Sequence, residues 1–348
     1  MKIALVCPAN MLYMPYVGNY TKILDEEGIK YDVIRWDRFQ IEEINEFVFR
    51  DSKACYKRGF FDYVKYSSFV FKLLKKYRYD KIVVFGIQLL FFLHRYLLKK
   101  YKNKYIIDIR DYHPLMHCFN MKKAIQNATS TVLSSPAYKQ WLPEGETYTV
   151  NHNTRIESLE NIHEADPSLP AKEHIFINYI GALREYQITV DFMNALKDSK
   201  RISLKFHGEG FVNKDIDAYL KQSPIRNVEL TGRYVREQEP SLYLSSDMIN
   251  ALEPNDFINC KTFLTNRLYN AAIYGKPVIA FEGTYLSEVV KEYDLGLVIK
   301  DFNNTEDAVL GYIRSFQVEL FDQGRRRFLE VVIKENKDFK EKVLNFVR

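Results

Sequence analysis

The fold is decided by the stretch Thr265-Asn266-Arg267-Leu268-Tyr269-Asn270-Ala271-Ala272-Ile273-Tyr274-Gly275-Lys276-Pro277-Val278-Ile279-Ala280. Its first half, 267–273, is predicted to form a short helix. Gly275 stops this helix because glycine accepts the left-handed conformation without a Cβ clash, and Pro277 prevents continuation. The apolar run 278–281 is predicted to be a buried strand. Helix, tight turn and buried strand together indicate an α/β packing unit.

Short apolar runs bounded by turn residues recur along the whole chain. Strands, some with the turn that follows, are predicted at 2–7, 31–35, 81–86, 105–110, 129–136, 148–153, 174–180, 202–206, 228–233, 246–252 and 278–281. Helical segments separate most of them, and this alternation predicts parallel sheets with right-handed crossovers. The predicted fold class is therefore α/β.

The length of 348 residues is sufficient for two domains, each with its own core. The polar stretch 157–172, which contains Pro167 and Pro170, is the best candidate boundary. We therefore expect the following organisation along the chain. An N-terminal domain covers 1–160, a linker 161–172, a C-terminal domain 173–325, and a final helix, 326–348, packs back toward the first domain. The alternative for this last segment is a solvated terminal helix.

The four cysteines, Cys7, Cys55, Cys118 and Cys260, are scattered and form no C-x-x-C pair. A zinc site or a disulfide framework is not expected, and a reducing compartment fits this usage. The chain shows no signal-peptide pattern and no apolar run of the roughly 18 residues needed to span a bilayer. A cytoplasmic location is the expectation.

Positive charge is concentrated in the first half of the sequence. The segment 65–105 holds eleven Lys and Arg residues against a single acid, Asp80. Two amphipathic helices are predicted there, at 69–77 and 89–101. Basic amphipathic helices suit an anionic membrane surface, here the inner face of the plasma membrane; the alternative is that they cover the sheet and their lysines are simply solvated. No nucleic-acid-binding motif accompanies the charge, so nucleic acid is not an expected partner.

The stretch 265–280 resembles the C-terminal half of GT-B glycosyltransferases, specifically the retaining, family 4-like enzymes of bacterial capsular and exopolysaccharide synthesis. Their pattern is roughly Asn-Lys-Leu-Tyr-Glu-x-x-Ala-x-Gly-Lys-Pro-Val-Ile-Ala. The segments Glu288-Val289-Val290 and 296–299 extend the likeness. This resemblance implies two Rossmann-like doubly wound domains with an interdomain cleft. It also implies transfer of a sugar, with retention, from a nucleoside diphosphate sugar to an acceptor hydroxyl.

The resemblance implies that the second domain binds most of the donor. Arg184 is expected to contact the diphosphate and Arg267 to lie beside the nucleotide. The family usually has a glutamate that holds the ribose hydroxyls where this chain has Asn270, and the acid eight residues earlier is replaced by Thr262. An amide still hydrogen-bonds a diol, but without charge assistance. The donor-binding residues expected in full are Gly18, Gly181, Arg184, His207, Gly208, Asn266, Arg267, Asn270 and Glu288.

The predicted strand at 105–110 is followed by a cluster of ionisable residues. Because ligands of open α/β sheets bind outside the carboxyl ends of strands, Arg110, Asp111 and His113 are the catalytic candidates. The family has His-Asp-Leu-Trp-Pro here, so its histidine falls on Arg110 and its tryptophan on His113. Arg110 is then suited to phosphate or acceptor charge. The alternative is a turn with a surface ion pair.

No metal and no other cofactor is expected, and basic residues with helix N-termini would stabilise the leaving diphosphate. The expected partners are a nucleotide-sugar donor and a glycan or lipid-linked acceptor in surface polysaccharide synthesis. Two alternatives stay open: a non-catalytic nucleotide-sugar-binding protein, and a GT-B sugar-nucleotide epimerase. The sequence does not determine the donor base, the sugar, the acceptor or the linkage.

Overall fold

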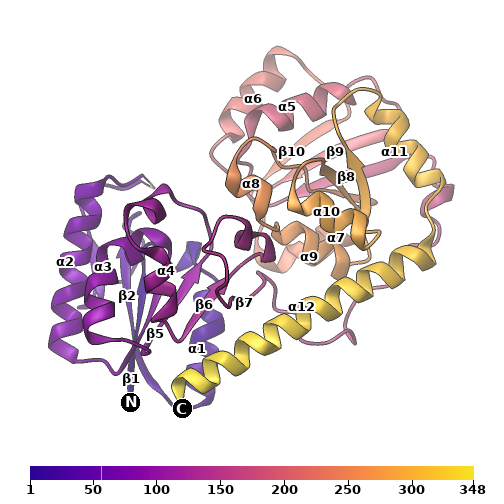
Figure 1. Cartoon of the computed structure of the whole chain (residues 1–348). Helices are drawn as coiled ribbons and strands as arrows, with labels where there is room; N and C mark the ends of the chain where they lie inside the picture. The colour runs from indigo at the N-terminus through magenta and orange to yellow at the C-terminus, as the bar shows by residue number, and fades with distance from the viewer. Residues whose placement is uncertain (56) are drawn as a thin grey trace. The chain divides into compact units, whose positions relative to one another are not determined.

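The computed structural model describes residues 1–55 and 57–348, which form two compact α/β units (Figure 1). The first unit comprises Met1–His152 and Lys334–Arg348, and the second comprises Asn153–Ile333. The long helix α12, Val318–Val347, therefore contributes residues to both units. The predicted α/β class with two Rossmann-like sheets is confirmed.

The first unit is built on a seven-stranded parallel sheet in the order β3-β2-β1-β4-β5-β6-β7. Its strands are β1 Lys2–Cys7, β2 Lys30–Asp37, β3 Val48–Arg50, β4 Lys81–Phe85, β5 Tyr105–Ile109, β6 Ser130–Leu133 and β7 Thr149–Val150. The central strands are buried on both faces, which explains why they appear in the sequence as continuous apolar runs.

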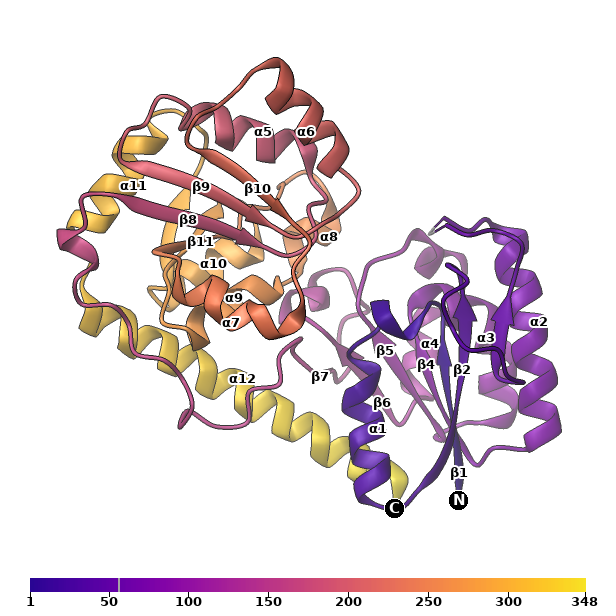
Figure 2. The same ribbon diagram turned by 180° about the vertical axis from the view of Figure 1, so that it is seen from behind.

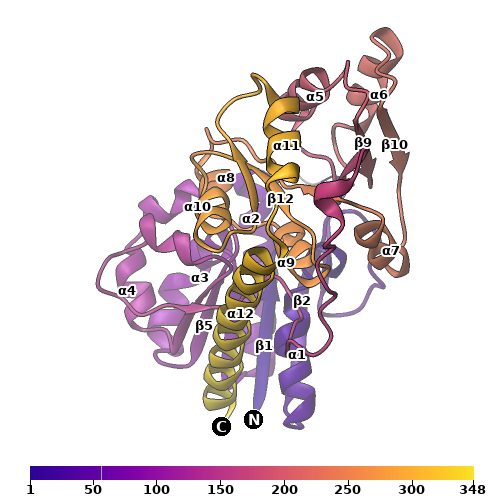
Figure 3. The same ribbon diagram turned by 90° about the vertical axis from the view of Figure 1, so that its right-hand side faces the viewer.

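Helices cover both faces of this sheet. They are α1 Val17–Glu26, α2 Phe60–Tyr77, α3 Ile87–Lys100 and α4 Met121–Gln126, with short 3₁₀ turns at Met11–Tyr13, Pro114–Cys118 and Pro136–Gln140. The last turns of α12 run beside α1 and β1 (Figure 3), where Phe339 meets Tyr20 edge to face with ring centres 5.0 Å apart. Helices α2 and α3 lie side by side (Figure 2) and are joined by Phe71 and Tyr96, 5.3 Å apart.

The second unit repeats the same topology with six parallel strands in the order β10-β9-β8-β11-β12-β13. Its strands are β8 Ile175–Ile180, β9 Ile202–His207, β10 Val228–Gly232, β11 Met248–Asn250, β12 Val278–Phe281 and β13 Gly296–Ile299. Its helices are α5 Tyr186–Ala195, α6 Asn213–Gln222, α7 Glu239–Leu244, α8 Ile258–Thr262, α9 Asn266–Ile273, α10 Tyr285–Glu292 and α11 Thr305–Arg314, with 3₁₀ turns at Leu169–Ala171 and Arg236–Gln238.

The helix and turn within 265–280 fold as predicted. Helix α9 ends at Ile273, and Gly275 has a φ of 66°, in the left-handed region. A Cβ at this glycine would lie 2.6 Å from the carbonyl oxygen of Glu164, so a larger residue is excluded by space as well as by conformation.

In each sheet the strand order reverses at the first strand of the unit, β1 or β8. Ligands of such sheets bind outside the carboxyl ends of the strands near this switch point. Candidate ligand-binding residues are therefore those that follow β1, β4 and β5 in the first unit and β8, β9 and β11 in the second. None of the helices described is long and apolar enough to cross a membrane.

Candidate functional site

In the first unit, Arg110 follows β5 and is buried in a network of polar side chains. Its Nε donates to Oδ1 of Asp108 at 2.5 Å, and its Nη2 donates to Oδ2 at 2.8 Å. Its Nη1 and Nη2 also donate to the backbone and side-chain oxygens of Asn151, at 3.0 and 2.8 Å. The guanidinium lies over the ring of Tyr16, 4.4 Å from its centre. All three nitrogens are therefore engaged by this unit itself.

The surroundings of Arg110 favour its positive charge. Burial disfavours the guanidinium ion, but the adjacent Asp108 carboxylate outweighs it, and the pKa of Arg110 is held above its ordinary value. Asp108 is fully buried and accepts a further hydrogen bond from the hydroxyl of Tyr20 at 2.7 Å. Asn151 in turn donates to Asn336 of α12 at 3.1 Å. Arg110 thus joins β5 to the segment after β7.

The other candidates of this unit lie around that network. Asp111 is exposed, directly after Arg110. His113 is half-buried, and its Nδ1 accepts from the backbone N–H of Leu115 at 3.2 Å. Burial lowers the pKa of His113, so the ring is neutral at neutral pH and available as a base or a hydrogen-bonding group. Gly18 lies in the first turn of α1, where an added Cβ would meet nothing within 4 Å.

In the second unit, the loops after β8 and β9 pack backbone against backbone through glycines. A Cβ on Gly208 would lie 2.1 Å from the carbonyl oxygen of Gly181, and one on Gly210 would lie 1.9 Å from that of Leu183. Gly181 has a φ of 140°, and the space beside it is open. The two loops therefore form a small surface of backbone at the carboxyl ends of the strands, which is a suitable place for a phosphate.

Arg267 is in the first turn of α9 and is 5% exposed. Its guanidinium stacks on the ring of Tyr179, 3.8 Å from the centre, and its Nη2 forms a salt bridge with Glu253 after β11. Its Nε has no hydrogen-bond partner among the described residues. Burial lowers the pKa of Arg267, but the neighbouring Tyr179 and Glu253 raise it by more. The pKa is therefore raised overall, and the guanidinium keeps its charge. This arginine keeps donor capacity for a ligand.

Asn270 lies one turn further along α9 and donates from Nδ2 to Oε1 of Glu239 at 3.0 Å. Glu239 is the first residue of α7, and burial raises the pKa of its carboxyl group. Position 270 itself has no carboxylate, but the carboxyl group of Glu239 in α7 lies beside it.

His207 ends β9 and is 6% exposed. Its Nδ1 is 2.8 Å from Oγ1 of Thr231, whereas its Nε2 has no partner among the residues that the structure describes. Burial, and then the charge of Lys205, lower the pKa of His207, so the neutral ring prevails at neutral pH. An unpaired buried nitrogen is costly, so His207 keeps hydrogen-bonding capacity that a ligand could use.

Three further donor candidates are exposed. Arg184 follows β8 and forms no ion pair with any described residue. Burial raises the pKa of the nearby Glu253, and the positive charges of Arg267 and Arg184 offset part of that rise. Asn266 begins α9, and Glu288 lies in the first turn of α10. Helix α10 is capped by Thr284, which accepts from the Ser287 N–H at 3.1 Å. Glu288 has no contact with the other candidates among those described. No group of three or more metal-ligating side chains occurs within the described ranges, 1–55 and 57–348.

Known protein structures resemble this fold. No protein-family model matches the chain, and no curated protein matches it in sequence. Solved structures do match. HepE of Anabaena, determined in complex with UDP and glucose, aligns with a TM-score of 0.68 over 99% of this chain and 100% of its own, at 13% identity. Sucrose-phosphate synthase of Thermosynechococcus elongatus aligns with a TM-score of 0.69, covering 99% of both chains at 13% identity. The lipopolysaccharide outer core galactosyltransferase WaaB gives 0.62 over 98% of this chain and 99% of its own, at 14% identity.

These matches define the class of fold: the chain has the two-domain GT-B architecture of glycosyltransferases, over nearly its whole length. This confirms the fold that the resemblance implied. Identities of 13–14% carry the fold alone.

Sequence reasoning missed several residues that the structure brings to these positions. Asp108, Asn151, Tyr179, Glu239 and Glu253 all contact a predicted site residue. Asp108 and Tyr179 lie in predicted strands, so their sequence pattern indicated buried strand positions and not site residues. Glu253 directly follows a predicted strand, which is the positional signal that could have identified it.

Proposed function

We propose that this protein is a glycosyltransferase that moves a sugar from a nucleoside diphosphate sugar to a hydroxyl group of a glycan acceptor. The observation that carries the proposal is Arg267 in the second unit: a buried, charged guanidinium with an unpartnered Nε, at the carboxyl end of a GT-B sheet. The fold likeness to glycosyltransferases that were crystallised with UDP and with UDP-glucose supports it.

Breaking the bond between sugar and diphosphate develops negative charge on the leaving group. We assign its stabilisation to Arg184 and Arg267, with Gly181 and Gly208 shaping the backbone surface beside them. Asn270 and Asn266 are assigned to the nucleoside, with His207 at the wall of the pocket and Glu288 on the sugar side. Two arginines can offset the diphosphate charge without a metal ion, so we propose metal-independent transfer.

The first unit is proposed to serve the acceptor. Asp111 and neutral His113 are the groups that can accept or orient a hydroxyl proton. Arg110 is committed to Asp108 and Asn151, and its role in the reaction is to hold the loop after β5 in place. Gly18 leaves open space at the start of α1. We further propose that the anomeric configuration of the donor is retained.

The acceptor is proposed to be lipid-linked, in surface polysaccharide synthesis, and a face of α2 supports this. Phe61, Lys65, Lys72 and Lys75 are all exposed and follow helical spacing on one side of the helix. Exposed aromatic and basic groups on one helix face suit an anionic surface. A cytoplasmic, peripheral position at the membrane follows from this proposal.

The test is turnover. The purified chain is incubated with UDP-, GDP- and ADP-sugars and with glycolipid acceptors, and release of nucleoside diphosphate is followed. We expect acceptor-dependent release with one class of donor, a product with the donor's anomeric configuration by NMR, and unchanged rates in EDTA. Binding of a donor without turnover would instead identify a non-catalytic nucleotide-sugar-binding protein. An altered sugar nucleotide formed without acceptor would identify an epimerase.

A further inference from the structure

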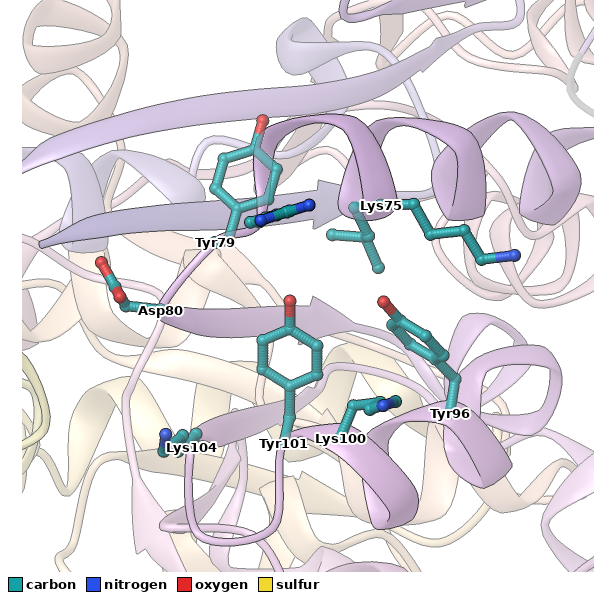
Figure 4. A pocket seen from close by; sticks show the side chains of 9 residues that line it. Lys75, Tyr79, Asp80, Tyr96, Lys100, Tyr101 and Lys104 are labelled. Carbon is teal, nitrogen blue, oxygen red and sulfur yellow. The ribbon is translucent and has the colours of Figure 1, made fainter.

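A concave site lies in the first unit, away from the carboxyl ends of its strands. It is a shallow cavity of about 360 Å³ between the C-terminal ends of α2 and α3 (Figure 4). The segments around it lead into the amino ends of β4 and β5. The cavity is therefore at the opposite end of this sheet from Arg110. No residue assigned to donor binding or catalysis lines it, and Lys75 is the one lining residue that also belongs to the α2 face proposed to meet the membrane.

Four cations line this cavity: Lys75, Arg78, Lys100 and Lys104. None of them forms an ion pair with any residue in the described part of the chain. By contrast, the neighbouring Lys76 is paired with Glu46 at 2.8 Å. Like charges gathered without counter-charges repel one another, so the arrangement favours an anion.

The negative charge nearby offsets only part of this. One carboxylate, Asp80, lines the cavity and accepts from the backbone N–H of Lys2 at 2.7 Å. The C-termini of α2 and α3 each contribute the equivalent of about half a negative charge. The four cations are offset by one carboxylate and by the two helix ends, which together count as about one further negative charge. A surplus of about two positive charges remains. That surplus matches the charge of a phosphate dianion.

The cavity also offers neutral hydrogen-bond donors. Figure 4 shows the hydroxyl groups of Tyr96 and Tyr101 directed toward the space between the two helices. Burial, reinforced by Tyr96, raises the pKa of Tyr101 to about 12, so its hydroxyl keeps its proton. Ammonium, guanidinium and phenol donors around one space are the groups that bind phosphate oxygens.

We propose that this cavity binds a phosphate group through Lys75, Arg78, Lys100 and Lys104. Two sources carry that chemistry: free phosphate in solution, and the phosphomonoester headgroup of an anionic lipid. The proposal is independent of the donor site, because the cavity lies in the first unit and every donor candidate except Gly18 lies in the second; Gly18 does not line the cavity.

The first arm of the test is calorimetric titration of the full chain with inorganic phosphate at low salt. The variant K100Q/K104Q removes two lining cations, and K99Q/K102Q is the matched control, since it removes the same charge from two exposed neighbours that do not line the cavity. All four lysines are exposed, so both variants should fold. We expect at least tenfold weaker phosphate binding in K100Q/K104Q and less than a twofold change in the control.

The second arm uses flotation with phosphatidylcholine vesicles that contain phosphatidic acid, or phosphatidylglycerol adjusted to the same surface charge. Loss of binding to phosphatidic acid in K100Q/K104Q alone would support the proposal with a lipid source, and an effect on inorganic phosphate alone would support it with a free source. Equal losses in the two variants, or phosphate binding that neither variant changes, would overturn it. Absence of binding in both arms would overturn it as well.

Discussion

Arg110 in the first unit and Arg267 in the second are both buried beside a carboxylate and over a tyrosine ring, and they differ in what they leave unsatisfied. Arg110 lies 4.4 Å from the ring centre of Tyr16 and engages all its nitrogens with Asp108 and Asn151. Arg267 lies 3.8 Å from the ring centre of Tyr179, and its Nε is unpartnered among the described residues.

This difference separates structure from binding. A guanidinium whose donors are all used within its own unit stabilises that unit, and a ligand could reach it only by breaking those bonds. A guanidinium that is buried but incompletely satisfied carries a cost that a bound anion relieves. The same residue type, buried in both units, is thus expected to give different phenotypes.

The largest effect is expected for Arg110→Ala. It leaves Asp108 buried without its counter-charge, and breaking such a pair costs about 3–5 kcal/mol. Both tryptophans, Trp36 and Trp141, lie in the first unit, so urea unfolding followed by tryptophan fluorescence reports on this unit alone. A loss in the free energy of unfolding of less than about 1 kcal/mol, which is typical of an exposed ion pair, would contradict the structural role assigned to Arg110.

A smaller effect, on binding, is expected for Arg267→Gln. Hydrogen bonds to charged groups contribute about 1.5–3 kcal/mol, so nucleoside diphosphate affinity should fall about 10- to 150-fold by the same principle. Glu253→Gln is the matched control, because it removes the salt bridge and keeps the guanidinium. Calorimetry should show affinity within a few-fold of wild type for this control. Equal losses in both variants would mean that Arg267 acts only through Glu253.

The amide at position 270 is expected to matter less. Asn270→Ala removes a neutral hydrogen-bonding group, whose net contribution is about 1 kcal/mol, or roughly fivefold in affinity. Glu239→Gln should have a similar effect if the displaced carboxylate contributes to the same contact. Titration with the preferred nucleoside diphosphate measures both. Unchanged affinity in the two variants would exclude the pair from the donor site.

The smallest effect concerns His207. Because burial lowers its pKa, the unfolded chain takes up a proton near pH 6.5 more readily than the folded unit does. The contribution of His207 to stability is therefore complete above pH 6.5 and is lost as the pH falls below it. NMR titration of the ring, assigned by comparison with His207→Gln, should give a midpoint below 6.5. A midpoint at or above that value would show that the ring is not desolvated.

The sequence predicted the sheets because their strands are buried on both faces and so form apolar runs. It did not predict β3, Val48–Arg50, since three residues in a charged and aromatic segment show no periodicity. The roles within the candidate site were harder. Arg110 and Asp108 are two residues apart, and nothing in that spacing shows that the side chains pair and turn inward. Glu239 and Asn270 are brought together only by the packing of α7 against α9.

The most direct measurement is thermal stabilisation by UDP, GDP, CMP and ADP, with their sugars, of wild type, Arg184→Ala and Arg226→Ala. Both arginines are exposed and lie in the second unit, but Arg184 follows β8 and Arg226 precedes β10. The account predicts a selective shift with one nucleoside diphosphate, reduced by Arg184→Ala and unchanged by Arg226→Ala. No shift with any nucleotide, or equal behaviour of the two variants, would contradict the assignment of a nucleotide-sugar donor to this unit.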